Sequence, residues 1–194
     1  MNALPAESQY GLLVEHGVET SFVVQWVSVG DADEVVRRLG LVEETVRGSG
    51  FQEARSSFSF SEERSRWVWV APFASGWSIV VFLTGGLTPS VEALSRDGQR
   101  VIEVIYELGE MEYPFYARDG MRMETIFVEE EYDEFMEDVD FDDLLPPAER
   151  LEQYLRVIGR ITGRFLDREF FVSEGVLGRL SGVDLEDSGC GGLG

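Results

Sequence analysis

RWVWVAP (residues 66–72) and GWSIVVFLTGG (residues 76–86) decide the fold of this 194-residue chain. Both stretches are rich in β-branched and aromatic residues, and Trp67 and Trp69 alternate so that they share one face of the first. Residues 72–76 contain the proline and glycine that a turn requires. We therefore predict an antiparallel hairpin. Its second strand, apolar on both faces, is expected to lie buried in the centre of a sheet.

Further strands are predicted on both sides of this hairpin. Apolar runs rich in β-formers occupy residues 23–29, 100–107, 112–117 and 121–128. The last two are joined by ARDGM, whose Asp-Gly pair is typical of a tight hairpin turn. Residues 43–65 are polar and rich in glycine and serine and are expected to be mostly loop, although Phe58 and Phe60 alternate with serines and indicate an edge strand. The middle of the chain is therefore expected to form an antiparallel meander.

Helices are predicted at the flanks of these strands. GDADEVVRRLG (residues 30–40) has an acidic first turn and ends with Gly40, and TPSVEALSRDG (residues 88–98) begins with Thr-Pro. A longer helix is predicted over residues 147–166 from its apolar stripe. The sequence FFVSEGVLGRL indicates a final strand and a short helix capped by Ser173. These elements predict an α+β fold, with a largely antiparallel five- to six-stranded sheet and helices packed mainly on one face.

Composition predicts one domain without a membrane span. Hydrophobic residues make up 44% of the chain, which is sufficient for a core, so we assign residues 1–183 to a single α+β domain. Residues 184–194 are glycine-rich and are expected to form a flexible tail. The single cysteine, Cys190, excludes an internal disulfide. Without a basic leader or a run of roughly 18 apolar residues, the protein is expected to be cytoplasmic.

The charge of the chain limits its partners. Thirty-seven acidic and sixteen basic residues give a formal net charge of −21. Such a field repels nucleic acids and anionic lipids and accelerates encounter with cationic proteins, so we expect a basic protein partner and no nucleic acid. Every basic residue is arginine. The absence of lysine excludes Schiff-base chemistry, a P-loop and a Ser-Lys dyad.

The densest charge lies in EEEYDEFMEDVDFDD (residues 129–143), which contains ten carboxylates in fifteen residues. Val128, Tyr132, Phe135 and Val139 recur at steps of four, three and four, which predicts an amphipathic helix with its acids facing solvent. We predict that this face binds a basic partner through charge and aromatic anchors. The residues assigned to it are Glu130, Tyr132, Glu134, Phe135, Glu137, Asp138 and Phe141.

A row of arginines is the second predicted contact surface. Arg156, Arg160, Arg164 and Arg168 recur at i, i+4 and project opposite the apolar stripe of the helix over residues 147–166, so they are expected to lie outside the core. Arg156, Arg160 and Arg164 are assigned to partner binding. Alternatively, this row and the acidic residues neutralise each other or face water, with each exposed pair contributing about 0–1 kcal/mol.

Catalytic, metal and cofactor motifs are not predicted. Asp138, Asp140 and Asp142 have the spacing of a calcium loop, but Asp143 stands where its sharp turn requires glycine. His16 has no nucleophile pattern nearby, and neither GxSxG nor a strand–GxGxxG–helix motif occurs. We therefore expect no catalytic residue, no cofactor and no specific metal site.

Several stretches resemble one known group of proteins. VVRRLG, GWSIVVF, ALSRDGQRV, FYARDGMRMETIF and ERLEQYLRVIGRITG occur in this order with an acidic segment between the last two. This order, over roughly residues 10–170, resembles an uncharacterised family of actinobacterial proteins known as a domain of unknown function. The resemblance implies no catalytic residues, because that family has no assigned activity.

The predicted function is that of a non-enzymatic acidic interaction protein that binds a basic protein, for example an immunity-type inhibitor or an antitoxin-like binder. One alternative is a small-molecule-binding module or weak carboxylate-dependent hydrolase with a pocket beside Trp67 and Trp77. Another is a subunit of a larger assembly that docks through the arginine row. The sequence does not indicate an oligomeric state.

Overall fold

The computed structural model describes residues 3–41, 46–57, 67–84, 91–139, 141–142 and 144–180. The strands of the described residues are Ser21–Val27 (β1), Val46–Gly50 (β2), Trp67–Ala74 (β3), Trp77–Phe82 (β4), Arg100–Glu107 (β5), Glu110–Met111 (β6), Phe115–Arg118 (β7), Met121–Arg122 (β8) and Glu174–Arg179 (β9). The α-helices are Gln9–Glu15 (α1), Ala32–Leu39 (α2), Phe51–Ser56 (α3), Val91–Leu94 (α4), Asp133–Met136 (α5), Pro147–Thr162 (α6) and Arg168–Val172 (α7), and two 3-10 helices cover Ile126–Val128 (η1) and Glu130–Tyr132 (η2).

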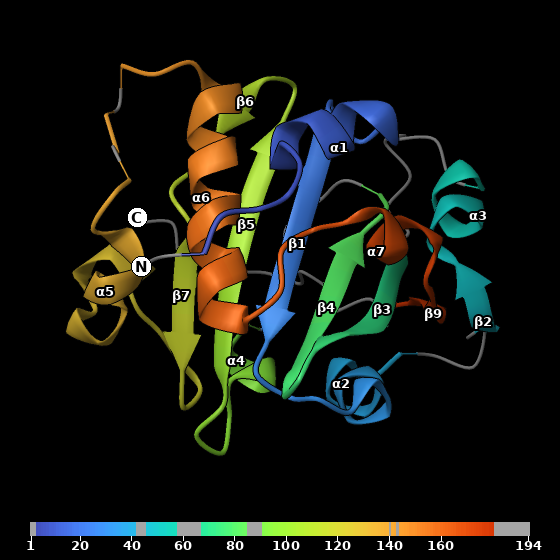
Figure 1. Ribbon diagram of the computed structural model, residues 1–194. Coiled ribbons are helices and arrows are strands. Elements are labelled where there is room, and N and C mark those ends of the chain that lie inside the picture. Colours follow the sequence, from blue (N-terminus) through green and yellow to red (C-terminus); the bar gives the residue numbers. More distant parts are fainter. Residues whose placement is uncertain are drawn as a thin grey trace, which may run out of the picture.

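The strands of the described residues form one antiparallel sheet of nine strands (Figure 1). Their order is β2-β9-β3-β4-β1-β5-β7-β8, and β6 pairs with β5. The predicted hairpin is confirmed as β3 and β4, and β4 is buried along its whole length. The predicted Asp-Gly turn is also confirmed, since Asp119 and Gly120 adopt φ values of 53° and 75° between β7 and β8. The α+β class is therefore correct.

The sheet is larger than the predicted five to six strands. β6 contains only two residues, too few to produce a readable alternation. β2 has the sequence VRGSG, which resembles a loop because it contains two glycines and a serine. The predicted C-terminal strand and short helix are β9 and α7. Ser173 is the C-cap of α7, and β9 follows it and enters the sheet between β2 and β3.

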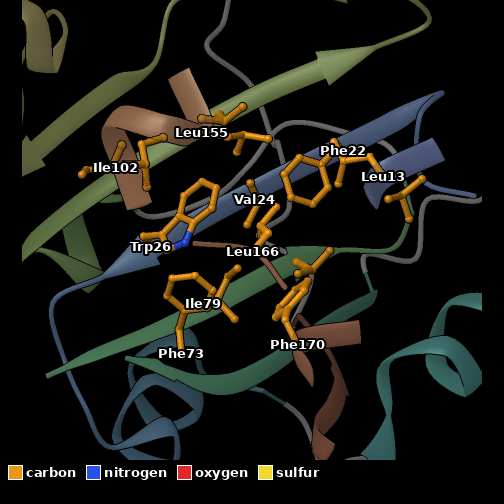
Figure 2. Packing of buried hydrophobic residues seen from close by; sticks show 14 of the residues in the cluster. Leu13, Phe22, Val24, Trp26, Phe73, Ile79, Ile102, Leu155, Leu166 and Phe170 are labelled. Carbon is orange, nitrogen blue, oxygen red and sulfur yellow. The ribbon is translucent and has the colours of Figure 1, made fainter. Parts of the chain in front are cut away.

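Helices cover both faces of the sheet, so the predicted packing mainly on one face is not exact. α1, α6 and α7 lie on the face that carries the larger core cluster, where Trp26 packs among Ile79 and Phe73 (Figures 1 and 2). α2 and α4 contribute Val35 and Leu94 to a second cluster on the opposite face. The central strands are apolar on both sides, and each side therefore needs a cover that excludes water.

Two predicted elements are shorter than expected, and other predicted features fall outside the described residues. The strand predicted over residues 121–128 ends at Arg122, and η1 follows. The helix predicted over residues 88–97 is described only as α4. Thr88, Phe58, Phe60 and residues 184–194 lie outside the described residues.

The start of α7 offers a direct test of capping. Asp167 Oδ1 accepts a hydrogen bond of 2.7 Å from the backbone N–H of Phe170, and both carboxylate oxygens accept from Arg164 at 3.0 and 3.1 Å. Burial favours the protonated acid, but the hydrogen bonds from Arg164 and Phe170 outweigh it and lower the pKa of Asp167. We expect Asp167→Ala to lower the free energy of unfolding by about 1–2 kcal/mol at pH 7.

This loss should shrink at low pH. Because the folded state lowers the pKa, the stabilisation is complete above the ordinary value of about 4 and disappears as the pH falls through the folded value. Urea denaturation at pH 7 and pH 3 would measure both differences. Glu169→Ala is the control, since Glu169 reaches Arg164 only at 4.0 Å. An Asp167→Ala effect no larger than that of the control would contradict the assignment.

Candidate functional site

The acidic segment, defined as residues 129–139, is not the single amphipathic helix that its spacing predicted. It consists of η2 followed by the one-turn helix α5. Val128, the first residue of the predicted apolar seam, is 61% exposed. Repulsion between like charges at i, i+4 opposes a continuous helix here. The packing of the apolar side chains against the domain, and not helix propensity, therefore sets the backbone conformation.

The apolar side chains of the acidic segment face the core. Tyr132 is only 2% exposed, and its ring packs edge-on against Tyr116 with centroids 5.7 Å apart. Phe135 packs against the same core cluster. Phe141, just beyond the segment, stacks with Tyr154 on α6, and the two ring centroids are 5.8 Å apart. These three aromatics therefore attach the segment to the domain, and Tyr132 is not accessible to a partner.

Asp138 and Arg160 form the strongest link between the acidic segment and α6. The Arg160 guanidinium donates to both carboxylate oxygens of Asp138, at 2.7 and 3.0 Å. It also donates to the carbonyl oxygens of Phe135 and Ala3, at 2.7 and 2.9 Å. Arg156 lies 3.6 Å from the same carboxylate. The acidic residues and the arginine row thus meet within one molecule.

The expectation that the arginine row lies outside the core is wrong for Arg160, whose side chain is 2% exposed. A helical projection predicts that this side of α6 is open to water, but α5 of the acidic segment packs against α6 and covers this side (Figure 1). The row is also shorter than predicted, because α6 ends at Thr162 and Gly163 adopts φ +80°. Arg164 instead donates to the carbonyl oxygen of Phe73 at 2.7 Å.

A second link joins the acidic segment to the sheet. Glu131 lies 3.5 Å from Arg118 and 3.8 Å from Arg100, and it accepts a hydrogen bond of 3.2 Å from the Tyr116 hydroxyl. The Tyr132 hydroxyl accepts from Arg100 at 3.2 Å. Burial raises the pKa of both tyrosines, so each hydroxyl keeps its proton at neutral pH. Glu131 is therefore fixed by donors and is not free to bind a partner.

The remaining carboxylates of the segment face outward. Glu130, Asp133, Glu134 and Glu137 are exposed, and the described residues place no arginine within ion-pair distance of them. At least ten described arginines are already paired with carboxylates inside the molecule. The acidic segment therefore presents uncompensated negative charge from a structured backbone.

A calcium loop is not supported by the parts of the segment that can be described. Asp138 is occupied by two arginines, and Asp140 and Asp143 lie outside the described residues. Among the described residues, no group of three or more acidic, histidine or cysteine side chains is arranged to hold a metal ion.

One cavity of the described residues lies beside the β3–β4 hairpin. It is at the end of β4 away from Trp77 and close to Trp67, whose carbonyl oxygen accepts a hydrogen bond of 2.9 Å from the Leu83 N–H. None of its lining residues is acidic, so it does not supply the carboxylate that the hydrolase alternative requires. Trp77 is buried in the core. His16 stacks on Phe171 with ring centroids 4.0 Å apart, which is a packing role.

Gln25 and Glu103 form a buried polar pair that was not predicted from the sequence. The Gln25 side-chain amide on β1 donates to a Glu103 carboxylate oxygen on β5 at 2.5 Å, and Arg122 lies 3.8 Å from the other oxygen. Both residues are almost fully buried on directly paired strands. The signal was a single polar residue in the middle of each apolar run, VVQWV and VIEVI.

In the part of the chain that is described, no helix combines the length and the apolar character needed to cross a bilayer. Comparisons with protein-family models, with curated proteins and with solved structures gave no match. The resemblance to an uncharacterised actinobacterial family therefore stays a prediction, and the function has to be argued from the geometry of the acidic segment.

Proposed function

We propose that this protein is a non-enzymatic interaction protein whose acidic segment binds a basic protein partner. One observation carries the proposal: the carboxylates of Glu130, Glu134 and Glu137 are exposed and have no arginine partner among the described residues, whereas the segment that bears them is fixed to the domain. Binding through a pre-ordered segment loses less conformational entropy than binding through a flexible acidic tail. The charge would accelerate association and disfavour acidic competitors.

The residues assigned from the sequence take two different roles in this proposal. Glu130, Glu134 and Glu137 contact the partner. The others hold the segment in place from inside, and they are Tyr132, Phe135, Asp138, Phe141, Arg156 and Arg160. Arg164 stands apart from both groups because it binds Asp167 and the carbonyl oxygen of Phe73.

An immunity-type inhibitor or an antitoxin-like binder, which covers a basic site on a toxin, is the kind of protein that fits this proposal. A cytoplasmic location and the absence of nucleic-acid binding are parts of the same proposal. Both follow from the net charge of −21 and from the reducing compartment suggested by a lone cysteine. The actinobacterial family resemblance is compatible with it and adds no residue to the site.

The test is a pull-down from the native lysate at low and moderate salt, read by mass spectrometry. The variant Glu130→Gln/Glu134→Gln/Glu137→Gln removes three exposed charges and leaves Asp138 on Arg160. The matched control removes three exposed charges elsewhere, from Glu53 on α3, Glu110 on β6 and Glu174 on β9. We expect wild type and control to retain a basic protein in the pull-down. When that partner is purified, the variant Glu130→Gln/Glu134→Gln/Glu137→Gln should bind it at least about tenfold more weakly than wild type does.

Either of two results would contradict the proposal. Equal retention by all three proteins would show that the acidic segment is not the contact. Equal loss from both variants would show that only the overall charge attracts the partner.

A further inference from the structure

A small cavity opens at the end of the sheet where β1 begins and β4 ends. It has a volume of about 40 Å³ and faces α3. A single water needs roughly 10–15 Å³ of such space, so the cavity admits a group of several atoms. Its lining residues are Val18, Ser21, Phe22, Phe51, Arg55, Val81, Phe82 and Leu83.

Most of this lining is apolar. Its two polar side chains are the hydroxyl of Ser21 and the guanidinium of Arg55. The Ser21 hydroxyl is buried and has no hydrogen-bond partner among the described residues. A buried hydroxyl without a partner costs free energy, which a ligand that accepts its hydrogen would recover.

Arg55 is the second polar group. It donates to the carbonyl oxygen of Gly17, and no carboxylate of the described residues lies within ion-pair distance of it. This is unusual in a chain in which acids outnumber bases by more than two to one and most described arginines are paired. A guanidinium carries five N–H donors, so one carbonyl partner leaves donors available for an anion.

We propose that this cavity binds a short-chain aliphatic monocarboxylate such as propionate. The alkyl tail would lie among Phe22, Phe51 and Leu83, where transfer from water is favourable. The carboxylate would accept from Arg55 and from the Ser21 hydroxyl. Charge-assisted hydrogen bonds from arginine are the strong component of such recognition. This site is independent of the acidic segment and of any protein partner.

Amide NMR titration of the full chain with sodium propionate tests the proposal. Propionamide has nearly the same shape without the charge, and sodium chloride at equal ionic strength controls for screening. We expect saturable shifts at the cavity residues with propionate, and at least about tenfold weaker binding of propionamide. Arg55→Met should weaken propionate binding by a similar factor, and Ser21→Ala by a smaller one.

Arg96→Met is the matched control, because Arg96 is exposed, has no carboxylate partner among the described residues and is not part of the cavity lining. Its propionate affinity should equal that of wild type. Dispersed spectra of Arg55→Met would confirm that it folds. The proposal is overturned if propionate causes no saturable shifts, if propionamide binds equally well, or if Arg55→Met and Arg96→Met bind propionate alike.

Discussion

Arg160→Met is expected to lower the free energy of unfolding by about 2–4 kcal/mol. Methionine keeps much of the buried stem but removes every donor, so the carbonyl oxygens of Phe135 and Ala3 lose their partner together with Asp138. Asp138 is 49% exposed and can be hydrated, which keeps the cost below that of an isolated buried charge. Urea denaturation followed by tryptophan fluorescence measures this change.

The neighbouring Arg156 supplies the matched control. Its only ion pair among the described residues is the 3.6 Å contact with Asp138, and its side chain is 24% exposed. We expect Arg156→Met to cost less than about 1 kcal/mol. Asp138→Asn completes a double-mutant cycle, in which coupling with Arg160 should clearly exceed coupling with Arg156. Equal losses for the two arginine variants would mean that Arg160 is not the link between the acidic segment and α6.

Gly175→Val is expected to destabilise the protein by about 4 kcal/mol or more. A Cβ atom at Gly175 would lie 2.5 Å from the carbonyl oxygen of Val70 and 2.7 Å from Cε2 of Trp69. Neither neighbour can move cheaply. The first is backbone in the middle of β3, and the second belongs to a fully buried indole whose Nε1 donates to the carbonyl oxygen of Ser49 at 2.9 Å.

The effect should already be present in Gly175→Ala, since the clash involves Cβ itself. Gly50→Ala is the control, because nothing lies within 4 Å of a Cβ added there and Gly50 does not require a positive φ. We expect the control to change the free energy of unfolding by less than about 1 kcal/mol. A Gly175→Ala protein as stable as the control would show that β9 can move away from Trp69.

Local periodicity was enough to predict the elements that bury a regular face. The boundaries of β5 match the prediction, and α2 and the β3–β4 hairpin were found because their apolar residues repeat within a few positions. β2 and β6 were missed, whereas β8 was predicted as the start of a longer strand. β2 becomes a strand because it pairs with the distant β9, and its own composition gives no such signal. β6 contains only two residues.

The sequence was sufficient to predict which residues belong to the candidate site, but not which of them are exposed. The acidic character of the segment is local, so Glu130, Glu134 and Glu137 were found. The burial of Arg160 and Tyr132 depends on which distant segment covers them, and a helical projection of α6 contains no such information. Gln25 and Glu103 show the converse, since a lone polar residue in each apolar strand was a usable signal of a buried pair.

The place of β9 affects how the chain can fold while it is being synthesised. Among the described residues, β2 pairs with no strand other than β9, and β9 is the last of these strands to be synthesised. A nascent chain that has already formed the central strands would therefore hold β2 and α3 undocked, with one edge of β3 open, until residues 174–179 leave the ribosome. Completion of this sheet therefore waits for β9, and a chain that stopped before residue 174 would lack the strand that joins β2 to β3.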